Sequence, residues 1–332
     1  MQVWIRRFVL LLLPLGFLAV MVAAPLLSLA FYDGEGAWAE VVADDYMRLR
    51  LGWTVAQAVL TCVLVTALGV PAAWVLARMD FAGRRTVLRL LMLPFVMPTL
   101  VAGMGVLALF GAHGMLAAGW QDTPWLLIYG NVFFNLPVLV RSAYQGFVRV
   151  PQARLLSAQS LGADAWRRFV WVEWPVVRAW VAGGACLVFL YCFSGFGLAL
   201  LLGGERFATV EVEIYRLVAY ELDMARASVL VWLVLAVTAA AGGLYAYWSR
   251  RVAVDKSVSP LPPRAPIWAW EKWLTATVLA MLAVCCLLPL AAVWLKAVSA
   301  GSSWAVLLEA QTWAAVWNTI RFSAAAVAAA TV

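Results

Sequence analysis

The chain has 332 residues, of which 65% are hydrophobic and 12% are charged, and its mean hydropathy is +0.91. Soluble domains average roughly 45–50% apolar and about 25% charged residues, so this composition excludes an ordinary soluble protein and indicates a polytopic membrane protein. The net charge is +7, but the basic residues are mostly arginines scattered over short loops. This pattern argues against a nucleic-acid partner and is typical of cytoplasmic loops of membrane proteins.

Eight apolar runs are predicted to be membrane spans, since a helix needs about 20 residues to cross a bilayer. The first run, 8–32, follows Arg6 and Arg7, so a cleaved signal peptide is the alternative for it. Its length and the lack of an A-x-A site near its end favour an uncleaved span. The other runs are 53–77, 90–110, 125–140, 179–202, 227–248, 273–295 and one that begins near Val316.

The charge of the loops predicts the topology. The N-terminus and the segments 78–89, 141–178 and 249–272 are rich in arginine or lysine, whereas the loops 33–50 and 203–226 are acidic. Basic loops lie on the cytoplasmic side of a membrane. We therefore expect a cytoplasmic N-terminus and six spans before the proline-rich stretch that follows residue 250.

An internal repeat is suggested by two similar span beginnings. "WTVAQAVLTCVLV" starts at Trp53 and "WNTIRFSAAAVAAATV" at Trp317, and Thr54 and Thr319 are 265 positions apart. Repeats are common among transporters, and a second copy would give a chain of roughly 515 residues. Chance similarity of two apolar segments is the alternative. The predicted division is a first span with an external loop (1–50), a first core (51–250), a cytoplasmic linker (251–272) and the start of a second core (273–332).

The sequence offers no common catalytic or metal site. The motif GxxxxGK[ST] is absent, so we do not expect the chain to hold ATP in a P-loop. His113 is its one histidine, and its cysteines all fall inside apolar runs, where small buried hydrophobes are expected rather than disulfides or zinc ligands. We therefore expect no enzyme, no metal site and no bound cofactor. An ion-coupled secondary transporter would need ionisable residues within its spans, and Arg89, Arg141 and Arg178 lie only at run ends.

The segment "LLSAQSLGADAWRRFVWVEWP", which begins at Leu155, is amphipathic and helix-forming. Gly162 can end one helix by adopting the left-handed conformation. A second short helix from about Asp164 would carry Trp166 on its apolar face, and Pro175 is expected to end it before the next span. Two short helices with a bend fit a groove in a partner protein. A helix lying on lipid headgroups is the alternative.

This segment resembles the cytoplasmic EAA loop of ABC-importer permeases, whose pattern is E-A-A, a glycine and then I-x-L-P. Gly162 and Pro175 stand at the family's spacing of thirteen residues, and Ala158 matches the second alanine. Leu156 and Ser157 stand in place of the glutamate and the first alanine, so the acidic residue of the pattern is missing. The resemblance implies an all-α, six-span permease core of the ABC importer (MetI-like) type, followed by the start of a second core.

The same resemblance implies the partners and the location. A multi-pass permease in the lipid of the bacterial inner membrane would couple to a cytoplasmic ABC ATPase dimer, which uses the ATP, and would receive substrate from a periplasmic binding protein. "NVFFNLPVLVRSAYQGFVRVP" and "FSGFGLALLLGGERFATVEVEIYRL" resemble fused permeases for thiamine or thiamine pyrophosphate, and ferric iron permeases are the alternative. The implied ATPase-coupling residues are Leu156, Ser157, Ala158, Gly162, Ala163, Asp164, Trp166 and Pro175.

Four polar or helix-breaking residues at membrane depth are candidates for the substrate pathway. They are Asn131 and Asn135 in the fourth run and Ser194 and Gly195 in the fifth. Polar groups within spans often face the interior of a bundle. Packing between helices is the alternative role for all four.

Overall fold

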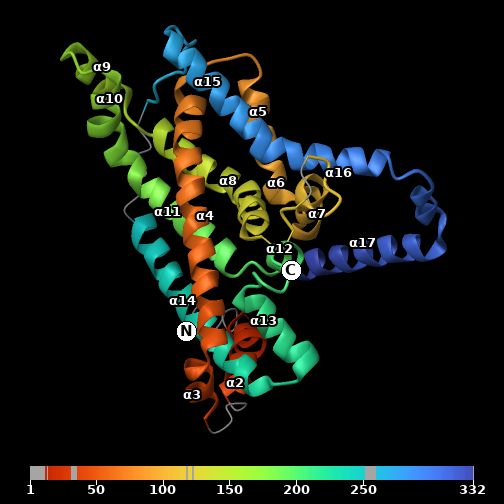
Figure 1. Ribbon diagram of the computed structural model, residues 1–332. Coiled ribbons are helices and arrows are strands. Elements are labelled where there is room, and N and C mark those ends of the chain that lie inside the picture. Colours follow the sequence, from red (N-terminus) through yellow and green to blue (C-terminus); the bar gives the residue numbers. More distant parts are fainter. Residues whose placement is uncertain are drawn as a thin grey trace, which may run out of the picture.

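The computed structural model describes residues 12, 14–30, 36–116, 119–121, 123–250 and 259–331, which form helices joined by turns and loops. Figure 1 shows long helices bundled around α4 (Asp45–Arg78). α4 packs against α8 (Pro124–Val148) and α11 (Trp174–Phe193), and α11 packs against α14 (Met224–Arg250). The all-α polytopic fold expected from the composition is confirmed.

Shorter helices connect and flank these long ones. They are α2 (Ala24–Ala30), α3 (Ala37–Ala43), α5 (Arg84–Leu90), α6 (Leu93–Val96), α7 (Thr99–Phe110), α9 (Gln152–Ser160), α10 (Ala165–Arg168), α12 (Phe196–Leu202), α13 (Val210–Arg216), α15 (Ala269–Leu282), α16 (Leu288–Val298) and α17 (Ala310–Thr331). Four π-helical turns, Ala19–Ala23, Phe169–Glu173, Leu217–Glu221 and Ala283–Leu287, and a 3-10 helix, Gly301–Leu308, complete the described elements.

The two ends of the bundle differ in charge. One end, at the top of Figure 1, holds the last turn of α4, α9, α10 and the start of α15, and we call it the basic end. The other end holds α3 and α13, and we call it the acidic end. The basic end carries Arg78, Arg84, Arg85, Arg154, Arg167, Arg168 and Arg264. The acidic end carries Glu40, Asp44, Asp45, Glu205, Glu211, Glu213, Glu221 and Asp223, which outnumber its arginines Arg48, Arg50, Arg206, Arg216 and Arg226.

Small residues allow α4 to approach its neighbours closely. Ala58, Ala72 and Ala73 are fully buried. A Cβ atom at Gly69 would lie 2.9 Å from Leu139 Cδ2 of α8. Lipid tails are as apolar as leucine, so helices in a membrane associate through such close van der Waals contact. The three central helices therefore form one packed unit.

The predicted third span, 90–110, is not one straight helix. The helical stretch Arg84–Val96 and α7 form a pair bent by 103°. Met97 is extended because it precedes Pro98, whose ring disfavours a helical residue before it. Sequence apolarity alone did not reveal this break.

The predicted fifth span, 179–202, begins earlier and breaks before its end. The helix runs without interruption over Ala165–Phe193, so the predicted helix stop at Pro175 is wrong. Pro175 lies in the first turn of α11, directly after a π-helical turn, where a missing N–H and the bulk of the ring are tolerated. The helix ends at Ser194, and Gly195 precedes α12.

The other predicted spans need smaller corrections. α8 continues to Val148, so the first part of the predicted 141–178 connection is helical. The described part of the first run forms an apolar helix over Pro14–Leu29, and Arg6 and Arg7 lie outside the described residues. Five described helices are long and apolar enough to cross a membrane, or six if the bent pair is one span.

The long helix that begins at Ala269 packs on the preceding helices. α15, a π-helical turn and α16 form one continuous helix over Ala269–Val298, and its second half lies against α7. At Gly105 of α7, a Cβ atom would lie 2.7 Å from the carbonyl oxygen of Pro289 and 3.1 Å from Val293 Cγ2. Only glycine allows this approach to a backbone atom.

Substitution of Gly105 by valine is expected to separate α7 from α16. Overpacking costs about 1–3 kcal/mol, so thermal unfolding of the detergent-purified chain should begin several degrees lower than in the wild type. Gly243→Ala is the matched control, because a Cβ atom there meets nothing within 4 Å. Equal melting temperatures for Gly105→Val and Gly243→Ala would show that the α7–α16 contact contributes nothing to stability.

Candidate functional site

The segment from α9 to α10, which we call the two-helix tip, bends at Gly162. Gly162 has a φ of +80°. Its N–H donates to the carbonyl of Gln159, and the N–H of Ala163 donates to the carbonyl of Ala158, both at 3.0 Å. These paired bonds form a Schellman motif, which satisfies the last carbonyls of a helix. The predicted role of Gly162 as the helix stop is confirmed.

The second helix of the tip begins with a capped turn. The Asp164 carboxylate accepts a hydrogen bond from the backbone N–H of Arg167 at 2.7 Å, as an N-cap residue does. The Arg168 guanidinium donates to the Gln159 side-chain oxygen at 3.2 Å, which joins α10 to α9. Asp164 is thus explained by local structure, and the two helices have a defined mutual angle.

The two-helix tip exposes three large apolar side chains among its polar residues. Leu161 is 87% exposed, Trp166 71% and Leu156 48%. In contrast, Leu155 is buried and belongs to the core. Exposed apolar side chains on a short projecting element are typical of a protein-binding surface.

The structure brings seven of the eight predicted coupling residues together. Leu156, Ser157 and Ala158 lie on α9, Gly162 and Ala163 at the bend, and Asp164 and Trp166 at the start of α10. Pro175 lies farther along, in α11. Leu161 lies between the named residues but was not one of them, because the sequence shows a leucine directly before the glycine and its exposure is visible only in the structure.

A buried ion pair holds the base of the tip. Arg78 Nε donates to Glu173 Oε1 at 2.7 Å, and the Arg78 guanidinium also donates to the carbonyl oxygen of Phe147 at 3.1 Å. The indole N–H of Trp74 donates to the second Glu173 oxygen at 2.9 Å. Arg78 and Glu173 are both about 5% exposed. These bonds join α4, the end of α8 and the start of α11. Glu173 was not predicted as a functional residue, and the signal that could have revealed it is an isolated acid among apolar residues.

Aromatic rings extend this junction toward the tip. The rings of Phe147 and Phe169 are 6.3 Å apart, and those of Phe169 and Trp166 are 5.8 Å apart, with both pairs stacked. Phe147 is fully buried. The stack therefore leads from Phe147 in the core, near the end of α8, to an exposed tryptophan.

The two breaks in the helices lie side by side. A Cβ atom at Gly197, near the start of α12, would lie 2.5 Å from Thr99 Oγ1 at the start of α7. Ser194 Oγ donates to the Leu190 carbonyl at 2.6 Å. The ring of Phe95, before one break, is 5.5 Å from that of Tyr191, before the other. Broken helices at membrane depth occur where the backbone is covered by protein or lines a cavity.

The two asparagines predicted for the substrate pathway are buried where α8 meets α4 and α11. Asn131 Nδ2 donates to the Gln57 side-chain oxygen at 2.8 Å, and Gln57 Nε2 donates to the carbonyl of Cys192 at 2.9 Å. Asn135 Nδ2 donates to the Asn131 carbonyl, and Asn135 Oδ1 has no hydrogen-bond partner among the described residues. These bonds connect α8, α4 and α11. Ser194, in contrast, is exposed beside its break.

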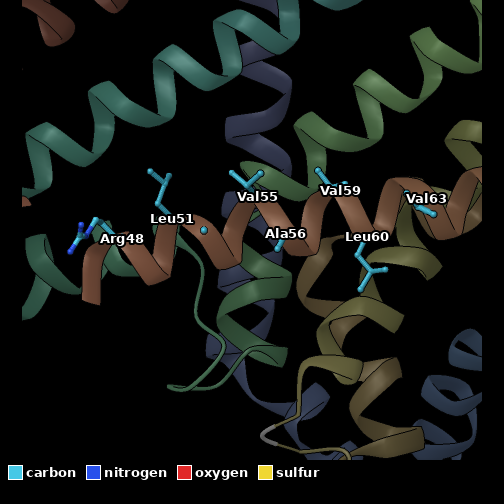
Figure 2. A pocket seen from close by; sticks show the side chains of 8 residues that line it. Arg48, Leu51, Val55, Ala56, Val59, Leu60 and Val63 are labelled. Atoms are coloured by element: carbon cyan, nitrogen blue, oxygen red, sulfur yellow. The ribbon is translucent and has the colours of Figure 1, made fainter. Parts of the chain in front are cut away.

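A shallow apolar hollow runs along the outer side of α4. Figure 2 shows its side chains projecting from this one helix, and its charged residue is Arg48 at one end. A site for a polar solute needs several polar groups that converge, and the hollow lacks them. We therefore place no solute there. Its lining residues are Arg48, Leu51, Gly52, Val55, Ala56, Val59, Leu60 and Val63.

Comparison with known proteins agrees with this arrangement. The family model described as "Binding-protein-dependent transport system inner membrane component" matches residues 65–254. The thiamine transport system permease protein ThiP of Salmonella typhimurium is 32% identical over 323 residues, which is 94% of this chain and 58% of the relative. ThiP of Brucella abortus is 35% identical over 68% of this chain and 44% of the relative. The chain thus spans little more than half the length of such relatives.

Solved structures show the same fold. A bacterial alginate ABC transporter in complex with an alginate-bound periplasmic protein superimposes with a TM-score of 0.62 at 16% identity, covering 75% of this chain and 95% of the other. A second alginate importer structure gives a TM-score of 0.63 at 14% identity, covering 76% and 98%. With the family model covering more than half of the sequence, this multi-pass chain belongs to the family of inner-membrane components of binding-protein-dependent transport systems.

Proposed function

We propose that this chain is the membrane-spanning permease subunit of an ATP-driven importer for thiamine or thiamine pyrophosphate. The observation that carries the proposal is the two-helix tip, an exposed apolar surface that the buried Arg78–Glu173 pair fixes to the packed spans. The substrate follows from relatives that are named as thiamine permeases and match most of this chain.

The charge of the two ends supports an orientation. The basic end would face the cytoplasm, as arginine-rich loops do, with the N-terminus on the same side. A cytoplasmic ABC ATPase dimer would then receive the two-helix tip and hydrolyse the ATP, while this chain binds no cofactor of its own. The acidic end would face the periplasm and the substrate-binding protein.

The adjacent helix breaks are the proposed part of the substrate pathway. Ser194 and Gly195 lie at one break and Pro98 at the other, and unwound backbone there offers polar groups to a passing solute. Asn131 and Asn135 would support this wall by holding α8 to α4. Residues 273–332 would begin a second core that faces the first, in line with the similarity between the stretches at Trp53 and Trp317.

Uptake of labelled thiamine tests the proposal. A bacterium without its own thiamine permease, carrying this permease with its ATPase and binding protein, should accumulate thiamine only when ATP is supplied. Excess thiamine pyrophosphate should compete with the label, and ferric iron should not. Uptake that follows an ion gradient without the ATPase would favour an ion-coupled transporter, and competition by ferric iron would reassign the substrate.

Replacement of Gly162 by valine should disrupt ATPase coupling. A β-branched residue is strained at a φ of +80°, where non-glycine residues cost roughly 1–2 kcal/mol, so the two-helix tip should lose its bend. Thiamine uptake and co-purification of the ATPase should both fall at least tenfold. Gly162→Asn is the matched control, because asparagine tolerates the left-handed region, and it should retain most of the uptake. Wild-type uptake by Gly162→Val would exclude the bend from coupling.

Replacement of Glu173 by glutamine should destabilise the base of the tip. It leaves the buried Arg78 guanidinium without a carboxylate, and breaking a buried pair costs about 3–5 kcal/mol. Thermal unfolding should therefore occur at a clearly lower temperature, with reduced uptake. Glu221→Gln removes one of the two carboxylates that pair with Arg216 at the acidic end, in a half-exposed pair, and such pairs contribute about 0–1 kcal/mol. Equal effects of the two variants would contradict the anchoring role of Glu173.

A further inference from the structure

The described part of the linker does not lie free beside the bundle. Residues 259–268, which we call the strap, bond to two separate elements of the first core. The Asp80 N–H donates to the Arg264 carbonyl at 2.8 Å, and the Arg264 N–H donates to the Arg78 carbonyl at 3.0 Å. The Gln152 N–H donates to the Ser259 carbonyl at 3.2 Å. The strap therefore joins the end of α4 to the first residue of α9.

The other end of the strap is fixed to the span that follows. Glu271, on the first turn of α15, is 2% exposed. It accepts hydrogen bonds from the Arg264 guanidinium at 2.6 and 3.2 Å and from the backbone N–H groups of Ile267 and Trp268 at 2.9 and 3.2 Å. Trp270 of α15 also stacks on Trp74 of α4, with ring centroids 6.2 Å apart. One carboxylate thus fixes the strap to the start of α15.

The composition of the strap makes it stiff. It contains Pro260, Pro262, Pro263 and Pro266, and proline fixes φ near −65° and favours extended, semi-rigid spacers. A flexible tether between two cores would need none of these bonds or prolines. A stiff segment that is bonded at both ends transmits displacement instead.

Space for such a displacement exists on one side of the strap. A cleft of about 440 Å³ separates the strap from the two-helix tip, with Leu156, Gln159 and Arg168 on one wall and Leu261 and Arg264 on the other. The tip and the strap meet at Gln152, where α9 begins. The cleft leaves the tip room to move toward the strap, and the bond at Gln152 links the start of α9 to the strap.

We propose that the strap passes movement of the two-helix tip directly to α15, with Arg264 and Glu271 as the positioning residues. The proposal rests on the proposed function, because the movement is that of a tip engaged by an ATPase. The linker then has a mechanical part in coupling. The helix Ala269–Val298 moves in step with the first core because the strap connects them covalently and through hydrogen bonds. Any coupling through the ATPase acts in addition.

Insertions on the two sides of Arg264 test the proposal in the assembled transporter. Six glycine and serine residues between Ala265 and Pro266 interrupt the strap before Ile267 and Trp268, whose N–H groups bond to Glu271 of α15. Thiamine import per ATP hydrolysed should then fall at least fivefold while ATP hydrolysis persists. The same insertion between Lys256 and Ser257 precedes the strap and should leave this ratio unchanged. If both insertions left thiamine import per ATP unchanged, or both lowered it equally, the proposal would be overturned. A strap that transmits force predicts that only the insertion within the strap lowers this ratio.

Hydrogen exchange of the purified chain gives a test that needs no transport. The Asp80 and Gln152 amides should exchange slowly in the wild type, and Glu271→Gln should speed both at least tenfold. Glu309→Gln is the matched control, because Glu309 is exposed, and it should leave both amides unchanged. Fast exchange of these two amides in the wild type, or unchanged exchange in Glu271→Gln, would show that the strap is not held as proposed. The two proposals can fail separately. If the assembled transporter imports no thiamine while the wild-type Asp80 and Gln152 amides exchange slowly, the proposed function is refuted but the strap is established.

Discussion

The ion pair between Arg78 and Glu173 is the interaction on which the arrangement of the basic end depends. Both groups are buried at the end of the spans, where removal of an unpaired charge from water costs several kcal/mol. Bonds from Trp74 and to the Phe147 carbonyl satisfy further polar groups of the pair. Arg78 lies on α4, Glu173 lies directly before α11, and the Phe147 carbonyl that accepts from Arg78 belongs to α8. These bonds can therefore form together only when the three helices meet at one angle. The two-helix tip inherits its direction from that angle.

A continuous helix links this tip to the interior of the membrane. The helix Ala165–Phe193 has 29 residues, so it spans about 43 Å at 1.5 Å per residue. Trp166 stands near one end, and Ser194 and Gly195 form the break at the other. Under the proposed function, force applied at Trp166 would therefore reach the broken helices. The π-helical turn before Pro175 is what makes this continuity possible.

The sequence was sufficient for features that depend on local chemistry. Apolar run length predicted the five described helices that are long and apolar enough to cross a membrane, but also spans at 8–32 and from Val316, where no described helix meets that measure. Gly162 was recognised as a helix stop because the left-handed conformation favours glycine. It was insufficient where tertiary context overrides the local rule. Pro175 breaks a regular α-helix but is tolerated after a wider turn, and the bend at Pro98 lies inside an apolar run that looks uniform. Glu173 lacked any visible partner, since Arg78 is 95 positions away.

Under the proposed function, the missing acid of the family pattern changes how the tip would dock. Leu156 stands where permeases of this kind have a glutamate, and it is exposed beside the more exposed Leu161 and Trp166. No carboxylate at that position is available to attract a basic groove, whereas burial of these three side chains would remove apolar surface from water at roughly 25 cal/mol per Å². Such attraction is short-ranged and insensitive to salt. The bend at Gly162 then matters more than in a charge-guided loop, because apolar contact yields affinity only when the two surfaces match in shape.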